Sequence, residues 1–502
     1  MPTECSQDSL DFGTVEGRHV VASFDGGSMT SDAGALLLGQ ADKAIGLVAR
    51  FAACFIDARN PDLIEHSIET LVGQRLFGLA LGYEDLNDHD ELRNDPVMAV
   101  LAGKLAARRK DCAPVAGKST LNRLEQALRG GVGRYHRIGH DEAAIQALFV
   151  DLFLGAHARP PKRIILDLDA TDDPLYGHQE GRFFHGYYDC YCYLPLYITC
   201  GRHLLAAKLR RANIDAAAGA KEEVARIIAR VRARWPKVKI IIRADSGFAR
   251  DEIMSWCEEN RVDYVLGLAR NPRLIASIKR ELVEARAEAR ESKAPARRFK
   301  DFSWATLDSW RRKRRVIAKA EWTSGKANPR FVVTSLKKRD ASARFLYEKL
   351  YCARGDMENR IKECQIDMFA DRTPASTMRT NQLRLWFASF AYVLVCALRR
   401  IGLAGTQLAQ ASCGTIRQKL LKIGARVTVS VRRVKLALAS ACPSRQIFCI
   451  AAEALRSAIA QARLPHQPAS AAHPTCPATT QKQHRSSEPS STVTTSHGFC
   501  RA

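Results

Sequence analysis

Two apolar, β-branched runs that each end in aspartate constrain the fold of this 502-residue chain most strongly. The first reads Arg163-Ile-Ile-Leu-Asp-Leu-Asp and ends at Asp169. The second reads Val238-Lys-Ile-Ile-Ile-Arg-Ala-Asp and ends at Asp245. Short continuous apolar runs of this kind are typical of strands buried in a sheet. We therefore expect a mixed sheet that carries these carboxylates at the ends of its strands.

The first run leaves two candidates for a functional carboxylate. Side chains at positions i and i+2 of a strand share a face, so Asp167 and Asp169 point the same way and either could bind a metal ion. Asp169 is favoured because it ends the apolar run, at the open edge where ligands usually lie. Asp172 and Asp173 fall further into the following loop, where we expect them to be solvated or to cap a turn.

A third carboxylate is selected by helical geometry. At 100° per residue, five polar side chains between residues 351 and 365 fall on one narrow stripe: Tyr351, Arg354, Glu358, Lys362 and Gln365. The adjoining apolar stripe should face the core: Met357, Ile361, Cys364 and Met368. Asp356 and Glu363 point elsewhere. The stripe could be a solvated face with an Arg–Glu pair, but two strand-end aspartates and a helical glutamate can also hold two magnesium ions.

The order of predicted elements defines the fold class. Three strands at 163–169, 192–200 and 202–209 are followed by a helix at 217–234 and a strand at 238–244. A helix at 250–260 and a strand at 262–268 complete the series. This order, βββ-α-β-α-β, is that of an α/β, ribonuclease H-like fold, in which we place the first part of a catalytic core at residues 160–268.

The remaining regions are predicted from composition and periodicity. We expect a mostly helical region over 1–155 that binds DNA ends, a β-rich insertion over 269–345, a second part of the core with the glutamate helix over 346–400, a basic region over 401–464 and a disordered tail over 465–502. The apolar stretch 385–398 has 14 residues. It is shorter than the roughly 20 that a bilayer span needs, which indicates a buried core helix.

The charge of the chain points to a nucleic acid partner. There are 77 Lys and Arg against 53 Asp and Glu, a net charge of +24. Such an excess favours a polyanion, and no basic amphipathic helix or lipidation signal points to a membrane instead. Residues 373–452 contain 12 Lys or Arg and no acid, which predicts a DNA-backbone surface that includes Arg432, Arg433 and Lys435. Fifteen scattered cysteines and a polar N-terminus are typical of a reduced, cytoplasmic protein.

Several motifs resemble one family. Asp-x-Thr at 169–171, Asp245-Ser-Gly-Phe and Tyr-x2-Arg-x3-Glu at 351–358 are similar to the insertion-sequence transposases with a DDE site, and more closely to insertion-sequence family thirteen-eighty. The segments 82–93, 177–189 and 381–387 also look like motifs of that family, so the resemblance covers roughly residues 10–460. One position departs from the related Tyr-Arg-Glu-Lys signature: Gln365 stands where lysine is expected, and Lys362 on the same stripe is the candidate replacement.

The resemblance implies a function. Asp169, Asp245 and Glu358 would be catalytic and bind two Mg²⁺ (or Mn²⁺) ions, while Tyr351, Arg354 and Lys362 would contact DNA phosphates. The protein would cut and paste double-stranded DNA at the inverted repeats of a bacterial element, as a dimer that bridges two ends and associates with the nucleoid. Two alternatives stay open: a nuclease of the same fold that cuts without joining, and a catalytically inactive DNA-binding remnant of an element.

Overall fold

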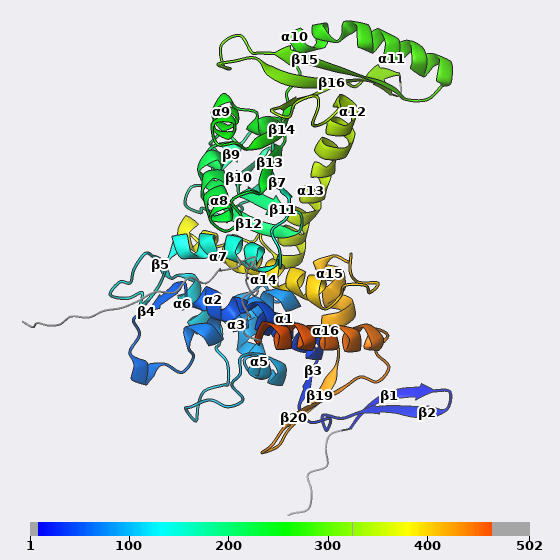
Figure 1. Ribbon diagram of the computed structural model, residues 1–502. Coiled ribbons are helices and arrows are strands. Elements are labelled where there is room, and N and C mark those ends of the chain that lie inside the picture. Colours follow the sequence, from blue (N-terminus) through cyan, green and yellow to red (C-terminus); the bar gives the residue numbers. More distant parts are fainter. Residues whose placement is uncertain (1–8, 324, 464–502) are drawn as a thin grey trace, which may run out of the picture. The chain divides into compact units, whose positions relative to one another are not determined.

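The computed structural model describes residues 9–323 and 325–463 (Figure 1). Residues up to Ala462 group into one compact unit, so the predicted regions within it are parts of one body. The predicted disordered tail, 465–502, lies outside the described residues.

A mixed sheet forms the centre of this unit. Its first five strands lie side by side in the order β12 (His203–Lys208), β11 (Leu196–Cys200), β7 (Arg163–Ala170), β13 (Lys239–Ala244) and β14 (Asp263–Leu268). The strands β7, β13 and β14 run parallel, whereas β11 is antiparallel to both of its neighbours. This is the arrangement expected from the βββ-α-β-α-β order, and the predicted ribonuclease H-like α/β fold is confirmed.

The predicted insertion continues the same sheet. Beyond β14 come β18 (Arg330–Thr334), β16 (Arg314–Thr323) and β15 (Ala296–Trp304), all antiparallel, with the short β17 (Lys326–Ala327) paired to β16. Two helices, α10 (Pro272–Ser277) and α11 (Lys279–Ser292), precede these strands, and α11 lies along β15 and β16 (Figure 1). The region is thus a mixed α/β addition, and the prediction of a β-rich insertion missed its helices.

The predicted strand at 192–200 is wrong in one respect, because it is two strands in two sheets. The first part, β10 (Cys190–Tyr193), pairs with β8 (Asp173–Pro174) and β9 (Phe183–His185) in a separate three-stranded sheet. The second part is β11 of the central sheet. Pro195 lies at the break, where a residue without a backbone N–H cannot continue the ladder.

The two faces of the central sheet are covered by different helices. On one face, α8 (Ala220–Arg234) and α9 (Asp251–Glu259) bury an apolar cluster that includes Ile240 and Ile242. On the other face, Ile241 and Val265 pack against the segment that begins at Leu346. Because both faces are covered, the strands are apolar on both sides, as the continuous runs in the sequence indicated.

The N-terminal region packs around one long helix, α14 (Met378–Ile401). Its helices include α1 (Leu36–Ile45), α2 (Leu47–Ala52), α3 (Ile68–Leu81), α5 (Pro96–Leu101), α6 (Lys118–Glu125) and α7 (Glu142–Gly155). Strands are also present, in the hairpin of β1 (Leu10–Val15) and β2 (Arg18–Ala22) and in the sheet of β4 (Phe55–Asp57), β6 (Ile138–His140) and β5 (Leu128–Arg129). By length and composition α14 could cross a membrane, but 78% of its most apolar window is buried inside the protein. It is the core helix predicted from the short apolar stretch.

The acid-free stretch divides into an internal and an exposed part. Arg384 donates to Glu84 and Glu125, and Arg399 pairs with Glu363 at 2.7 Å. These arginines therefore form ion pairs within the protein and are not available to DNA. Exposed basic side chains remain on the hairpin of β19 (Ala425–Val429) and β20 (Val434–Leu438), which pairs with β3 (Met29–Thr30). The chain then enters α16 (Arg445–Arg463). The lack of local acids therefore does not make the whole stretch a basic surface.

Candidate active site

Asp169 and Asp245 occupy neighbouring positions at one edge of the central sheet. Asp169 is the penultimate residue of β7, and Asp245 directly follows β13, which pairs with β7 in parallel register. One oxygen of Asp169 accepts from the backbone N–H of Ala170 at 3.0 Å, and Asp245 accepts from that of Gly247 at 2.9 Å. The two strand-end carboxylates are thus fixed side by side, with their remaining oxygens available to partners from elsewhere in the chain.

Asp167, the other candidate on β7, has a structural contact instead. It lies opposite Arg243 of β13, and the buried pair forms two parallel hydrogen bonds of 2.5 and 2.8 Å. Arg243 also donates to the backbone carbonyl of Leu350 at 2.5 Å. This pair therefore ties the two aspartate-bearing strands to the segment that leads into Tyr351, and Asp167 has no free oxygen face to offer a ligand.

The helix that carries the predicted polar stripe is irregular. A π-helical segment, η5 (Leu346–Tyr351), is followed by a 3₁₀ turn, η6 (Cys352–Arg354), then α13 (Gly355–Lys362) and a second π-helical segment, η7 (Glu363–Asp367). The assumption of one regular α-helix was wrong. The apolar stripe is nevertheless confirmed, because Met357, Ile361, Cys364 and Met368 are all buried. Glu363 points away from the site, to Arg399.

Arg354 connects two of the three carboxylates. One of its terminal nitrogens donates to Asp169 at 2.9 Å and the other to Glu358 at 3.1 Å. Burial raises the pKa of Asp169 to about 6 although Arg354 opposes the shift, and the nearby Asp245 and Glu358 raise it further. Burial disfavours the charged form of Arg354, yet Asp169, Tyr351, Asp245 and Glu358 hold its pKa above the usual value. Arg354 thus bridges two carboxylates, and the charge of Asp245 acts on it from nearby.

The Tyr351 hydroxyl lies near Asp245, in space left free by the missing side chain of Gly267 in β14. A Cβ built on Gly267 would lie 2.5 Å from the Tyr351 hydroxyl, 2.9 Å from the Ser246 nitrogen and 3.1 Å from the Asp245 carbonyl carbon. Only a residue without a side chain leaves room for the hydroxyl beside the Asp245 backbone. Sequence reasoning missed Gly267, although an isolated glycine inside an apolar strand is a known sign of close approach.

The last two residues of the polar stripe, Lys362 and Gln365, have different surroundings. The Gln365 amide donates to the backbone carbonyl of Asp172 at 3.0 Å, so it holds the loop that follows β7. Lys362 is exposed and forms no ion pair with any residue that the structure describes. Its position one turn beyond Glu358 leaves it free to meet a ligand.

Asp173 corrects another prediction. It is buried, not solvated, and accepts from the Thr373 hydroxyl at 3.1 Å, while its second oxygen has no partner within the described part of the chain. Burial raises the pKa of this carboxyl to about 8.

The carboxylates do not form a ready-made metal ligand set. Within residues 9–323 and 325–463, no three His, Cys, Asp or Glu side chains are close enough together to hold a metal ion. Arg354 lies between Asp169 and Glu358 instead. The donor chemistry nevertheless fits a hard divalent cation, because all three side chains offer carboxylate oxygens and together exceed the charge of Arg354. Holding a cation would require Arg354 to move aside.

The predicted DNA-contacting residues of the basic region lie elsewhere. Arg432, Arg433 and Lys435 are exposed around the turn of the β19–β20 hairpin.

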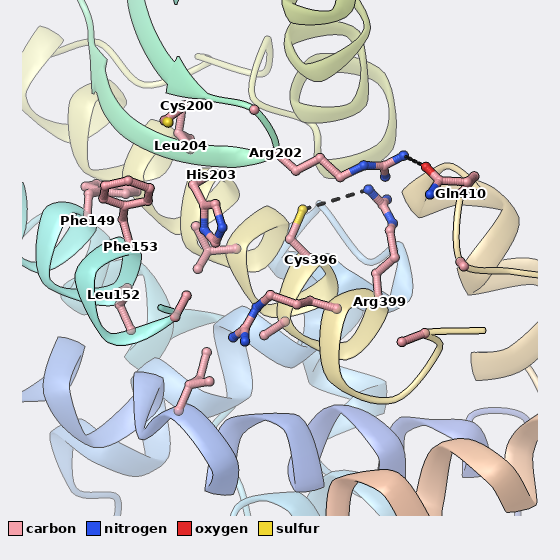
Figure 2. A pocket seen from close by; sticks show the side chains of 18 of the residues that line it. Phe149, Leu152, Phe153, Cys200, Arg202, His203, Leu204, Cys396, Arg399 and Gln410 are labelled. Atoms are coloured by element: carbon pink, nitrogen blue, oxygen red, sulfur yellow. Dashed lines mark hydrogen bonds between the residues drawn. The ribbon is translucent and has the colours of Figure 1, made fainter. Parts of the chain in front are cut away.

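A separate cavity of about 520 Å³ lies between α7, α14 and the turn joining β11 to β12 (Figure 2). Its walls include Phe149, Phe153 and Arg399 but none of the predicted site residues, so it is not part of this site.

The described geometry is a ribonuclease H-like sheet with two aspartates at one edge and an arginine that bridges one of them to a glutamate of the facing helix. The sequence matches the family model described as transposase DDE domain group 1 over residues 12–460, and the chain belongs to that family. DDE transposases generally use divalent metal ions.

No curated protein matches the chain. A solved structure that it resembles is a cryo-EM structure of piggyBac transposase in a synaptic complex with hairpin DNA. The identity is 11%, the match covers 86% of this chain and 82% of the other, and the TM-score is 0.38.

Proposed function

We propose that this protein cleaves DNA at the inverted repeats of an insertion sequence and joins the freed ends to a target, in cut-and-paste transposition that depends on a divalent metal. The observation that supports the proposal is the bridging of Asp169 and Glu358 by Arg354 at the sheet edge, where Asp245 follows the strand next to that of Asp169. Membership of a transposase family supports the same reaction class.

The three carboxylates are proposed to hold two Mg²⁺ or Mn²⁺ ions. When bound, such a pair activates a water molecule, and later a DNA 3′-hydroxyl, and stabilises the leaving oxygen. Asp169 and Asp245 are fixed by backbone N–H groups, whereas Glu358 is more exposed and is held mainly by Arg354. Glu358 is thus the carboxylate with the most freedom to adjust when DNA enters.

Arg354 is proposed to exchange its carboxylate partners for DNA phosphate. Its planar guanidinium can bind two phosphate oxygens in the way it now binds Asp169 and Glu358. Lys362 would add a positive charge one helical turn further on, and the Tyr351 hydroxyl would donate to a phosphate near Asp245. These side chains orient the scissile phosphate against the carboxylates.

The proposed partners are the two ends of the element and a target duplex. Arg432, Arg433 and Lys435 would contact the DNA backbone, and a dimer would bring two ends together. We place the protein in the bacterial cytoplasm, associated with the nucleoid, and in insertion-sequence family thirteen-eighty by its Tyr-Arg-Glu pattern.

The test uses the DNA that flanks this reading frame, which supplies the ends. Glu358→Gln should abolish magnesium-dependent nicking of these ends while DNA binding persists, because phosphate contacts come from other residues. Asp356→Asn is the matched control, since Asp356 is an exposed acid on the same helix that makes no side-chain contact to the site. Equal nicking by Glu358→Gln and the control would refute the proposed site.

A second substrate separates the proposal from its alternatives. An end already cut to expose its 3′-hydroxyl should be joined to a target plasmid by the wild-type protein. Cutting without joining would identify a nuclease, and metal-independent binding with neither reaction would identify an inactive remnant.

A further inference from the structure

The segment that follows the first site aspartate exposes an unusual number of aromatic side chains. Within residues 176–191, Tyr176, Phe184, Tyr187 and Tyr191 are all exposed, Tyr176 at 94% and Tyr187 at 85%. The other exposed aromatic side chains in the described chain are scattered: Phe12, Phe24, Tyr135 and Phe345. A concentration of exposed rings in one short segment marks an interaction surface.

The three-stranded sheet of β8, β9 and β10 fixes how these rings are presented. Phe184 and Tyr191 are directly opposite each other on β9 and β10, with ring centroids 5.5 Å apart. Their neighbours Phe183 and Cys192 point the other way, into a small buried cluster. The strand alternation therefore holds one apolar face inside and leaves one aromatic face outside.

A guanidinium extends this aromatic face. The Arg182 guanidinium lies over the Tyr191 ring, 3.7 Å from its centroid. Flat π-systems beside a stacked arginine suit nucleobases, because every base has a π-face and is flanked by phosphate.

The turn of this sheet lies at the carboxylate site. The Tyr188 hydroxyl donates to the backbone carbonyl of Ala170, next to Asp169, at 3.3 Å. Tyr187 is adjacent in sequence, with its ring centroid 5.0 Å from that of Tyr188.

We propose that the aromatic face formed by Arg182, Phe184 and Tyr191, together with Tyr187 in the adjoining turn, binds unpaired DNA bases beside the scissile phosphate. The inference rests on the proposed function for the presence of DNA at the carboxylates. It adds a separate binding step: bases that leave the helix at the cut end stack on these rings, which holds the end open. Because stacking is tolerant of sequence, the surface would recognise unpaired character and not a base code.

The experiment measures binding without metal, so that it does not depend on cleavage. The probes are a short mixed-sequence single strand that contains 2-aminopurine, and a fully paired duplex of the same sequence. Tyr187→Ala and Phe184→Ala should each weaken single-strand binding about tenfold and leave duplex binding nearly unchanged. The quenching of 2-aminopurine fluorescence that accompanies stacking should fall in parallel, and Tyr187→Trp should restore it.

Tyr135→Ala is the matched control, because Tyr135 is 83% exposed and also lies near an arginine, Arg134, but belongs to another region. It should change neither measurement. Equal losses on single strand and duplex, or no loss at all, would overturn the inference. So would a change in the sedimentation of the DNA-free variants, which would identify a surface for a second protein molecule. Stacking without metal-dependent cutting would instead contradict only the proposed function.

Discussion

Two aspartates that lie two residues apart on β7 each contact an arginine, and the two contacts differ in burial and in the number of partners. Asp167 and Arg243 are both buried and form a closed pair in which each group has one dominant partner. Two residues further on, Asp169 shares Arg354 with Glu358, and Asp245 lies nearby. A buried structural pair and a candidate site can therefore share residue type and strand position. They differ in the number of carboxylates for each cation and in the access of these groups to solvent.

The largest effect is expected from a substitution of Asp169, the aspartate of the proposed site. Asp169→Asn should reduce end cleavage by on the order of 10³-fold or more, because a metal ligand supports several kcal/mol of transition-state stabilisation. Thermal unfolding should show no loss of stability, since the change removes one of three mutually repelling carboxylates. A large drop in melting temperature would mean that Asp169 is a structural residue like Asp167.

Breaking the closed pair should have the opposite outcome. Asp167→Ala leaves Arg243 buried without its counter-charge and should lower the free energy of unfolding by about 3–5 kcal/mol, measured by urea denaturation. The double change Asp167→Leu with Arg243→Met should recover most of that stability. Its cleavage should stay reduced by about 10–100-fold, because the donor to Leu350 that positions Tyr351 is gone. Full activity in the double variant would show that the pair only stabilises the fold.

Asp173 is a buried carboxylate that forms no ion pair with any residue in the described part of the chain. Its pKa of about 8 in the folded protein exceeds that of an unfolded aspartate, near 3.8. Its contribution to stability is therefore complete below about pH 4 and is lost as pH rises from about 4 through about 8, a change on the order of 5 kcal/mol. Asp173→Asn should remove this component from the pH dependence of unfolding. Parallel pH profiles for variant and wild type would show that Asp173 is ionised in the fold.

The smallest expected effect concerns the space that Gly267 leaves for Tyr351. Gly267→Ala should destabilise the protein by about 1–3 kcal/mol through the close contact with the tyrosine hydroxyl and the Ser246 backbone. Cleavage should fall by up to about 10²-fold as Tyr351 is displaced.

Two variants control for this change. Gly155→Ala, at a helical position with nothing within 4 Å of the new Cβ, should be neutral or slightly stabilising. Adding Tyr351→Phe to Gly267→Ala should relieve part of the strain. Strictly additive losses in the double variant would show that the two residues do not compete for space.

Most of the core sheet could be predicted because its strands are apolar runs with clear ends. The buried face of α13 could be predicted because its apolar residues recur with nearly helical spacing. The choice between Asp167 and Asp169 could not be settled from a strand alone, since both share a face. The difference between them comes from Arg243, which lies on the neighbouring strand β13 but far away in sequence and pairs with Asp167. The π-helical segments, the break at Pro195 and the burial of Asp173 likewise depend on tertiary packing that local patterns do not record.

The continuity of the sheet has a consequence for any attempt to trim the molecule. The outer backbone edge of β14 is hydrogen-bonded to β18, which belongs to the segment that seemed a digression in the sequence. Deleting residues 269–345 would leave the backbone amides and carbonyls along this edge of β14 unpaired. The neighbouring strand is β13, which Asp245 directly follows. Such a bare edge invites pairing with other chains, so a shortened version should aggregate instead of folding into a minimal enzyme.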